Sequence, residues 1–324
     1  MNNLHSKHVL VTGAAGFIGA NLVRELLQHG ATVHALVRPG TKLWRIADII
    51  PSLNLHIVDL TNRADLQRAV NQIKPEIVFH LAVPSGYPSQ PQARVDMLQT
   101  SVLGTANLLE AITPIDFHRF VHFGSSLEYG PRNKPLKESD RLEPLTFRGV
   151  AKAAATLLCQ QFARANRRPV VVLRPFLVYG YWESPARLIP TAIRVALRNE
   201  EIDLTAPGYR RDFIFVKDVV ESCLLAVQAE RVAGEIINVG SGQQRSNEEV
   251  VEMVQAVSGQ KVRVRVGAYP PRPADTPHWV ADIRKAKKLL GWEPRHTLRS
   301  GLEKTIAWVR QHLDVYDAFM QDNR

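Results

Sequence analysis

The sequence predicts an α/β protein with a doubly wound parallel sheet of the Rossmann type and a smaller C-terminal lobe. Short β-branched runs alternate with amphipathic helical stretches through the first half of the chain. These runs are apolar at nearly every position, which is typical of strands that helices cover on both faces. A glycine-rich turn at residues 13–19 joins the first run to the first helical stretch. Such an order of elements predicts parallel strands connected by crossover helices.

Strand-like runs of the first half give the expected sheet. They cover residues 8–12, 32–37, 55–58, 77–81, 120–125 and 170–173. After Arg174 the alternation is less regular, and prolines gather at residues 185–190 and 270–277. A second, smaller lobe is therefore expected from this point. The segment 212–240 again has the pattern of strand, helix and strand, so it is expected to return to the sheet.

Composition limits the class of protein. The chain has 324 residues, 45% of them apolar, which is enough for a large core. The net charge of +10 is spread over the whole length without a nucleic-acid motif, so small anionic ligands are favoured over nucleic acid as partners. No apolar run reaches the roughly 18 residues of a membrane span, and the N-terminus lacks a signal-peptide pattern. We expect a cytoplasmic protein.

The two cysteines point to packing rather than to chemistry. Cys159 and Cys223 both lie within apolar helical patterns. Neither a disulfide framework nor the spacing of a zinc site is present in the sequence. No metal is expected.

Chemistry begins at the glycine-rich turn. Gly13, Gly16 and Gly19 let the backbone approach a pyrophosphate, and Phe17 and Ile18 begin a helix whose N-terminal N–H groups attract anions. Because the turn follows a strand and opens a helix, the pattern is specific for a dinucleotide. Its three-and-three glycine spacing resembles that of the short-chain dehydrogenase/reductase superfamily.

Further motifs extend this resemblance over nearly the whole chain. In order they are Val58-Asp59-Leu60, Phe79-His80-Leu81-Ala82, Gly104-Thr105-Ala106-Asn107, Gly124-Ser125-Ser126, Leu173-Arg174-Pro175, Arg211-Asp212-Phe213, Asn238-Val239-Gly240 and Leu290-Gly291-Trp292. The chain resembles an extended short-chain dehydrogenase/reductase of the nucleotide-sugar epimerase/dehydratase group.

The resemblance implies roles for several of these residues. Asp59 and Leu60 would contact the adenine, and Leu81 and Ala82 would lie beside the cofactor. Residues 1–174 together with 212–242 would form the dinucleotide-binding domain. Residues 175–211 and 243–324 would form the substrate-binding lobe.

The end of the second strand bears on the choice of cofactor. An acidic residue there would bind the ribose 2′-hydroxyl of NAD, but this stretch has none and ends in Arg38. A guanidinium is suited to a 2′-phosphate, and Lys42 and Arg45 would assist it. The sequence therefore favours NADP, with NAD as the alternative.

The catalytic positions depart from the family at one residue. The resemblance implies that Ser125 holds the reacting oxygen and that Lys152 orients the nicotinamide ribose. Arg148 stands four residues before Lys152, where the family has the tyrosine that exchanges the proton. Arginine keeps its own proton at any working pH, so it cannot be the base. We interpret Arg148 as a fixed cation facing the substrate, as the mark of a protein that binds without turnover, or as a substitution.

Other groups could then handle the proton. The candidates are Glu128, Tyr129, Tyr179 and Tyr181. Glu128 lies one place out of register with the glutamate of the family's dehydratases, so a solvated carboxylate or a partner for a nearby arginine is favoured over a catalytic role. Ser101 and Leu177 replace two asparagines of the family, and Ser101 falls where the family places a polar group that faces the site.

Substrate contacts are implied mainly by arginines. Arg211 corresponds to the family arginine at the nucleotide end of a sugar nucleotide, and Arg272 resembles a second one aimed at the diphosphate. Arg187 and Ser126 are added as further substrate-binding candidates.

These expectations converge on one function. We expect an NAD(P)-dependent epimerase, dehydratase or 4-ketoreductase that acts on a nucleoside diphosphate sugar by hydride transfer, with a modified acid/base site. The alternative is a sensor or partner subunit that binds dinucleotide and sugar nucleotide without turnover. The resemblance also implies a homodimer formed through the helices that carry residues 104–111 and 152–164.

Overall fold

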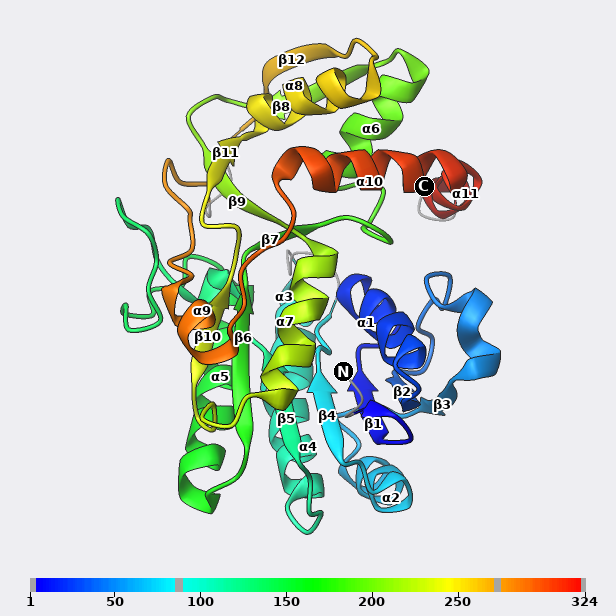
Figure 1. The fold of residues 1–324 in the computed structure, drawn as a ribbon, viewed down its shortest axis with the longest axis vertical. Coiled ribbons are helices and arrows are strands. Elements are labelled where there is room, and N and C mark those ends of the chain that lie inside the picture. Colours follow the sequence, from blue (N-terminus) through cyan, green and yellow to red (C-terminus); the bar gives the residue numbers. More distant parts are fainter. Residues whose placement is uncertain (1–3, 85–89, 271–274, 322–324) are drawn as a thin grey trace.

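A computed structural model describes residues 4–84, 90–270 and 275–321 of the chain. Within these residues, seven strands form one parallel sheet in the order β10-β6-β5-β4-β1-β2-β3 (Figure 1). In chain order they are β1 (His8–Thr12), β2 (Thr32–Val37), β3 (Asn54–Ile57), β4 (Ile77–His80), β5 (Arg119–Phe123), β6 (Val170–Pro175) and β10 (Ile236–Val239). The predicted doubly wound sheet is confirmed.

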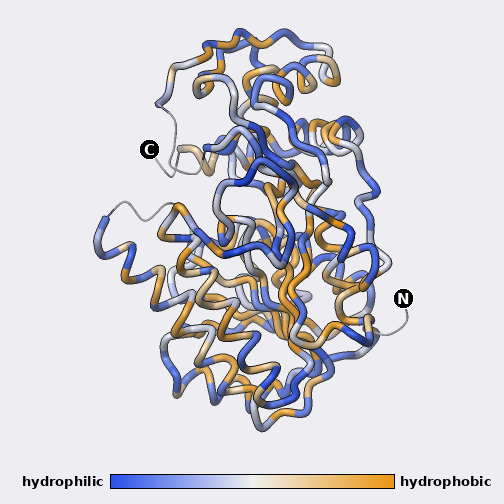
Figure 2. The backbone as a smooth tube through the Cα atoms, turned by 90° about the vertical axis from the view of Figure 1, so that its left-hand side faces the viewer, coloured by the Kyte–Doolittle hydropathy of each residue, from blue (hydrophilic) through white to orange (hydrophobic). Residues whose placement is uncertain are grey.

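Helices cover both faces of this sheet. They are α1 (Phe17–Gln28), η2 (Ala47–Ser52), α2 (Arg63–Ile73), α3 (Pro91–Leu98), η3 (Gln99–Leu103), α4 (Gly104–Ile112), η4 (Ser126–Glu128), α5 (Phe147–Asn166) and α7 (Val216–Gln228). One apolar cluster packs α1 and α7 against the sheet, and a second packs α2, α4 and α5 against the other face. Figure 2 shows the apolar segments gathered in the interior of the molecule.

The remaining elements form a smaller part beyond the carboxyl ends of the large-sheet strands (Figure 1). It contains two small sheets, of order β11-β9-β7 and β12-β8. Its elements are β7 (Leu177–Tyr179), α6 (Leu188–Arg198), β8 (Glu201–Thr205), β9 (Arg210–Phe215), β11 (Gln244–Ser246), α8 (Asn247–Ser258), β12 (Arg263–Tyr269), α10 (Leu298–Gln311) and α11 (Leu313–Gln321). Helix α9 (Arg284–Leu290) lies instead beside β10, at the edge of the large sheet (Figure 1).

The returning segment differs in part from the expectation. β10 does join the large sheet, where it pairs in parallel with β6. β9, its first strand, lies instead in a small sheet between β7 and β11. The apolar pattern of β9 identified a strand but could not identify its partners, because pairing is decided by the rest of the fold.

An aromatic cluster joins the loop after β2 to the C-terminal helices. Trp44 lies 5.0 Å from Phe319 and 6.0 Å from Trp182, measured between ring centroids. Trp182 is also 4.8 Å from Trp308 of α10. Arg45 Nε donates a 2.7 Å hydrogen bond to the carbonyl oxygen of Trp182. We call Trp44, Trp182, Trp308 and Phe319 the aromatic bridge, because it connects the two parts of the molecule.

Candidate active site

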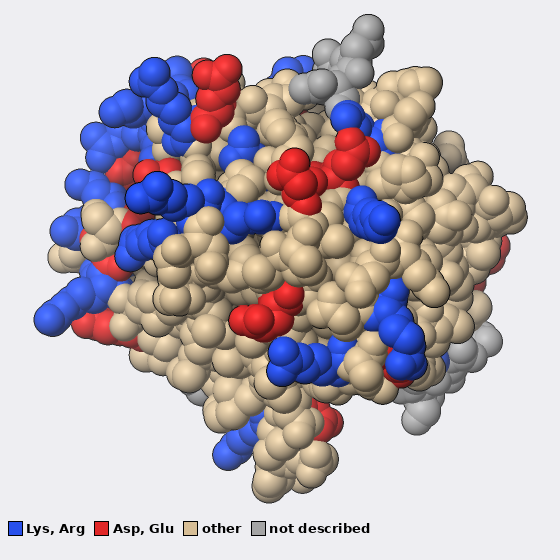
Figure 3. Space-filling view, turned by 90° about the horizontal axis from the view of Figure 1, so that it is seen from below, with Lys and Arg blue, Asp and Glu red and all other residues tan. Residues whose placement is uncertain are grey.

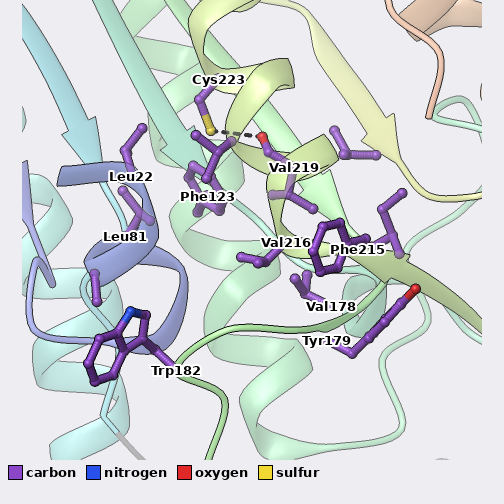
Figure 4. Close-up of a cluster of buried hydrophobic side chains, with 14 of the residues drawn as sticks. Leu22, Leu81, Phe123, Val178, Tyr179, Trp182, Phe215, Val216, Val219 and Cys223 are labelled. Carbon is purple, nitrogen blue, oxygen red and sulfur yellow. Dashed lines mark hydrogen bonds between the residues drawn. The ribbon is translucent and has the colours of Figure 1, made fainter. Parts of the chain in front are cut away.

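The glycine turn lies at the carboxyl end of β1, directly against the end of β4. Gly13 has a φ of +70°, and a Cβ atom there would approach the Ala82 nitrogen to 2.9 Å. A Cβ at Gly19 would collide with the Gly13 carbonyl oxygen. The turn therefore has room only for glycine at both positions. As a result, Leu81 and Ala82 lie against the turn that opens α1, which begins with Phe17 and Ile18. Leu81 and Leu22 of α1 belong to the same buried apolar cluster (Figure 4).

The loop after β3 is held against α4. The Asp59 carboxylate accepts hydrogen bonds from the Thr61 N–H and hydroxyl at 2.8 and 2.7 Å. Asn107 Nδ2 donates to the Leu60 carbonyl oxygen at 2.9 Å, and the buried Leu60 side chain fills the space beside Gly104. These contacts place Asp59 and Leu60 at the same edge of the sheet as the glycine turn.

Arg38 stands at the end of β2, at this same edge. Its side chain is exposed, so a ligand beside the strand end could reach it. Arg45, by contrast, is held in the aromatic bridge by its bond to Trp182 and lies over the Trp44 ring at 4.2 Å. Of the basic residues expected to assist Arg38, Arg45 is therefore engaged in packing.

A buried histidine connects three elements behind the turn. His80 Nδ1 lies 2.7 Å from Thr12 Oγ1, and its Nε2 lies 2.9 Å from Thr105 Oγ1. Burial lowers the pKa of His80 to about 3, so the ring is neutral at working pH. In the sequence, His80 stood out only as part of a family motif. Its hydrogen-bond partners lie on β1 and α4, which come together with β4 only in the folded chain.

Ser125 lies half-buried at the end of β5, where it caps the short helix η4. Its Oγ accepts a hydrogen bond from the Leu127 N–H, and its own N–H donates to Glu128 Oε1 at 2.7 Å. Glu128 is fully buried and forms a 2.7 Å ion pair with Arg174. The Thr156 hydroxyl donates to the same carboxylate at 3.0 Å. Glu128 thus supports the serine turn and forms an ion pair with Arg174. This agrees with the expectation that a glutamate one place out of register with the family's dehydratases could be the partner of a nearby arginine.

The tyrosines considered for proton transfer are engaged elsewhere. Tyr129 donates to Asn238 Oδ1 at 2.8 Å and accepts from Arg174 Nη1 at 2.9 Å, and burial raises its pKa to about 12. The Tyr179 hydroxyl donates to the Leu298 carbonyl oxygen at 3.3 Å. Tyr181 packs edge-on against Phe215, and burial raises the pKa of its hydroxyl. None of the three takes the place of a tyrosine at residue 148.

Helix α5 begins beside the serine turn and carries Arg148 and Lys152. The Thr146 hydroxyl caps the helix by accepting from the Gly149 N–H at 3.1 Å. A Cβ at Gly149 would collide with the Leu127 carbonyl oxygen, so the helix start packs directly on η4. The structure thereby brings Ser125, Arg148 and Lys152 into one neighbourhood.

Lys152 and Arg148 have different surroundings. Lys152 is 4% exposed, and its Nζ donates to the Phe123 carbonyl oxygen at 2.6 Å. Burial, and secondly the charge of Arg148, lower the pKa of Lys152 to about 8. Arg148 is half-buried and its Nη1 lies 3.4 Å from the Pro84 carbonyl oxygen, at the exit of β4.

The two replaced asparagine positions lie differently from each other. Ser101 is buried within η3, a π-helix, and its hydroxyl is directed at the Met97 sulfur, 3.7 Å away. Leu177 is half-buried in β7. The Ser101 hydroxyl is thus engaged with Met97, one turn earlier in the chain.

The proposed substrate residues are dispersed. Ser126 is buried and accepts a 3.1 Å hydrogen bond from Trp279 Nε1. Arg211 pairs with Asp275. Arg187 is exposed at the N-cap of α6, and Arg272 lies outside the described residues.

The sequence reasoning did not single out Asp212, which orders the loops around Arg211. Its buried carboxylate accepts bonds from the Ser241 N–H at 2.6 Å and from the N–H groups of Gly242 and Ala281 at 3.0 Å. Burial raises its pKa to about 6, despite these donors. The only signal for this role was its place in the Arg211-Asp212-Phe213 motif.

The described part of the chain has no helix long and apolar enough to cross a membrane, and no group of three or more His, Cys, Asp or Glu side chains arranged for a metal. Both cysteines are buried free thiols. Lys and Arg gather toward one side of the face in Figure 3, with acidic side chains among them.

Fold and site together define an enzyme of the Rossmann type, in which the glycine turn, Ser125 and Lys152 lie at the carboxyl edge of the large sheet. Residues 9–240 match the model of the NAD dependent epimerase/dehydratase family, and the chain belongs to this family. The resemblance seen in the sequence is confirmed.

Relatives of known name lie at moderate identity. A dTDP-glucose 4,6-dehydratase of Neisseria gonorrhoeae is 30% identical, with 93% of this chain and 95% of that protein covered. The structure of MoeE5 with UDP-glucuronic acid and NAD has a TM-score of 0.82 at 35% identity, covering 94% and 99% of the two chains. A UDP-glucuronic acid 4-epimerase of Bacillus cereus, also with UDP-glucuronic acid and NAD, has a TM-score of 0.84 at 27% identity, covering 94% and 99%.

Proposed function

We propose that this protein is an NAD(P)-dependent epimerase, dehydratase or 4-ketoreductase of a nucleoside diphosphate sugar. The observation that carries the proposal is the meeting of the glycine turn, Ser125 and Lys152 at the carboxyl edge of one parallel sheet. UDP-glucuronic acid and UDP-glucose are the first substrates to test, because they are bound in solved structures of MoeE5, which is 34–35% identical to this chain.

The residues present fit a dinucleotide. Only glycine fits at Gly13 and Gly19, which leaves the backbone of the turn and the N-terminus of α1 open to a pyrophosphate. Asp59 and Leu60 would hold the adenine end, and Leu81, Ala82 and Lys152 the nicotinamide end. A bound nicotinamide dinucleotide supplies the hydride acceptor and donor. Ser125 would hold the reacting sugar oxygen through its hydroxyl.

We propose NADP as the preferred form, with NAD as the alternative. The support is the exposed Arg38 at the end of β2, where no carboxylate is available for a ribose 2′-hydroxyl. The test compares the affinities of NADPH and NADH for the wild type and for Arg38→Ala. We expect a loss of at least tenfold for NADPH alone, with Arg231→Ala, at an exposed position between α7 and β10, as a control. Equal affinities in both proteins would contradict the NADP preference.

We also propose the division into lobes 1–174 with 212–242, and 175–211 with 243–324. The sugar nucleotide would bind between them. Arg211 and Arg187 would contact its phosphates, with Arg272 and Ser126 as further contacts. The close pairing of Arg211 with Asp275 supports a preformed orientation of this guanidinium. Binding would then compete with that ion pair.

One assay tests the proposed activity. The protein is incubated with a panel of UDP- and dTDP-sugars and either dinucleotide, and the products are identified by NMR and mass spectrometry. An altered sugar, or a 4-keto sugar, is the expected product. Tight binding of sugar nucleotides without any product would instead support the sensor or partner role.

We propose a homodimer formed through α5 and the neighbouring η3 and α4. The support is the exposure of large apolar side chains there: Leu103 is 49%, Val150 46% and Leu157 55% exposed. Leu157→Asp should convert the dimer to a monomer in light scattering. Val266→Asp, at another exposed apolar position, serves as the control. A monomeric wild type would contradict this proposal. We further propose a cytoplasmic location, in keeping with two free thiols.

A further inference from the structure

Arg148 leaves the proton-transfer step without its usual group. A guanidinium has a pKa above about 12 and keeps its proton at working pH. Glu128 is enclosed by Arg174, Thr156 and the Ser125 N–H, while Tyr129 is bonded to Asn238. The Tyr179 hydroxyl donates to the Leu298 carbonyl oxygen, and Tyr181 packs edge-on against Phe215. The proton of the sugar hydroxyl therefore needs a different acceptor near Ser125.

Lys152 is the titratable group that the geometry places there. It lies one helical turn after Arg148 on α5, and the start of that helix packs on the Ser125 turn through Gly149. Its Nζ is buried and donates to the Phe123 carbonyl oxygen, two residues before Ser125. A neutral amine can keep this bond with one N–H and still offer its lone pair.

We propose that Lys152 is the proton-exchanging residue of this enzyme, acting through one water, while Arg148 holds the negative charge that develops on the sugar oxygen. The inference rests on the proposed function and names the group that performs its proton step. A water is included because Lys152 is only 4% exposed and its Nζ is bonded to the Phe123 carbonyl oxygen. Ser125 Oγ, Arg148 and Lys152 Nζ supply the two to four polar partners that a bound water needs.

The proton step balances without a further reagent. In the oxidising direction the O–H bond of the sugar hydroxyl breaks, and its proton passes to the water. The water gives one of its own protons to the Lys152 lone pair, so a new N–H bond forms and the amine becomes an ammonium. The electron pair of the adjacent C–H bond leaves in the hydride transfer of the proposed function. In the reducing direction the ammonium returns the proton by the same route.

The charges around Lys152 set its protonation. On its own helix it faces Arg148 and the buried Cys159 thiol, and from η4 it faces the Glu128 carboxylate. His80 of β4 and His122 of β5 also lie close, and burial lowers the pKa of both rings so that they are neutral. Burial and Arg148 outweigh Glu128, and the pKa of Lys152 falls to about 8. Both the amine and the ammonium are then populated near neutral pH.

The first test reads the protonation of Lys152 without turnover. The ε-methylene carbon of each lysine is followed by NMR from pH 6 to 12, and Lys152 is assigned from its loss in Lys152→Met. We expect an inflection near pH 8 for Lys152. Arg148→Met should raise the Lys152 inflection by about one unit, because it removes the nearby cation. An inflection above 10 in the wild type would overturn the proposal.

The second test uses chemical rescue. Lys152→Ala should lower kcat by about 10²–10⁴-fold, the usual range for a lost acid/base group. Added methylamine, ethylamine or ethanolamine should restore kcat by at least tenfold, with a dependence on the pKa of the amine. Lys152→Arg keeps the charge but cannot exchange the proton, so it should stay as slow as Lys152→Ala. Lys304→Ala should match the wild type.

Each outcome of the rescue experiment decides one question. The proposal would be overturned if Lys152→Arg had the kcat of the wild type. It would also be overturned if added amines failed to rescue a Lys152→Ala protein that still binds dinucleotide and sugar nucleotide. Either result would reduce Lys152 to a positioning role. A wild type inactive on every sugar nucleotide would contradict the proposed function itself. The NMR titration would then still decide whether Lys152 is poised to exchange a proton.

Discussion

At the scale of single residues, the backbone around position 148 is held by contacts that do not involve the side chain at that position. Thr146 caps α5 and Gly149 packs on Leu127, and neither contact uses the side chain at position 148. The neighbouring Lys152 is anchored to Phe123 rather than to Arg148. A tyrosine or an arginine could therefore stand at this place without moving Ser125 or Lys152. The substitution alters which group exchanges a proton, not where the groups lie.

Glu128 provides the clearest stability prediction for a single residue. Its fully buried carboxylate pairs with Arg174, which is only 1% exposed. Removing one partner of a buried pair leaves an uncompensated charge, at a cost of about 3–5 kcal/mol. We expect Glu128→Ala to lose this much unfolding free energy in denaturant titrations. Glu110→Ala, at an exposed position on α4, should change it by less than about 0.5 kcal/mol. A loss below about 1 kcal/mol in Glu128→Ala would contradict the prediction.

At the scale of elements, three histidines form a ladder across the large sheet. His8 Nδ1 lies 3.0 Å from His34 Nε2, and His34 Nδ1 lies 3.0 Å from His56 Nε2, which links β1, β2 and β3. Burial, with the neighbouring rings as a second cause, lowers the pKa of His34 from 6.5 to about 4. Three imidazoles joined by two hydrogen bonds can accept one extra proton at an outer nitrogen. A second extra proton must break the ladder.

This ladder predicts acid sensitivity. The folded state binds fewer protons at His34 than the unfolded chain, so the contribution is complete above pH 6.5 and is lost as pH falls toward 4. Allowing for water near the outer rings, we expect about 1 kcal/mol less stability at pH 5 than at pH 7 from His34. His34→Gln should flatten the pH dependence measured by urea unfolding. His5→Gln, at an exposed position, should leave it unchanged, and equal slopes in all three proteins would count against the ladder.

Element prediction from sequence succeeded where the pattern was local. The strands at 8–12 and 32–37 are confirmed residue for residue, and the other four shift by one or two residues because their ends turn into the site loops. The pairing of β9 and the π-turn of η3 were not predicted. Both depend on contacts distant in the sequence, which a local pattern does not contain.

For the candidate site, motifs led to residues but not to their bonds. Ser125, Arg148 and Lys152 were named in advance, and they do lie together. The links of His80 to two threonines were missed, and the arginine suggested as a partner of Glu128 was not identified as Arg174, since these bonds join positions 25 to 68 residues apart. Buried polar networks of this kind are specified by three-dimensional packing.

At the scale of the whole molecule, the aromatic bridge is the feature that connects the loop after β2 to the C-terminal helices. Trp182 takes part in it with a φ of +65°, a backbone region that bulky residues rarely adopt. The strain is offset by contacts on several sides, with Arg24 4.4 Å above the ring and Trp44 and Trp308 beside it. The loop that begins at Arg38 is thereby tied to α10 and α11.

This connection can be tested by removing Trp44. Trp44→Ala leaves a cavity beside Phe319 and Trp182, and we expect a loss of about 2 kcal/mol in unfolding free energy. Hydrogen exchange of α11 should accelerate at the same time, because its packing partner on the other part is gone. Tyr269→Ala removes an aromatic ring that is 52% exposed and should change neither quantity. Unchanged exchange in α11 would contradict the coupling.

The return of β10 to the edge of the large sheet has a consequence for protein engineering. β10 pairs with β6 although the elements from β7 to α7 lie between them in the chain (Figure 1). The two halves of the chain therefore contribute neighbouring strands to one sheet. A chimaera joined to a relative at residue 174 would place a foreign β10 against the native β6. With the proposed division into lobes, exchanging sugar specificity between relatives by recombination would require two inserted segments, residues 175–211 and 243–324, and three junctions rather than a single crossover.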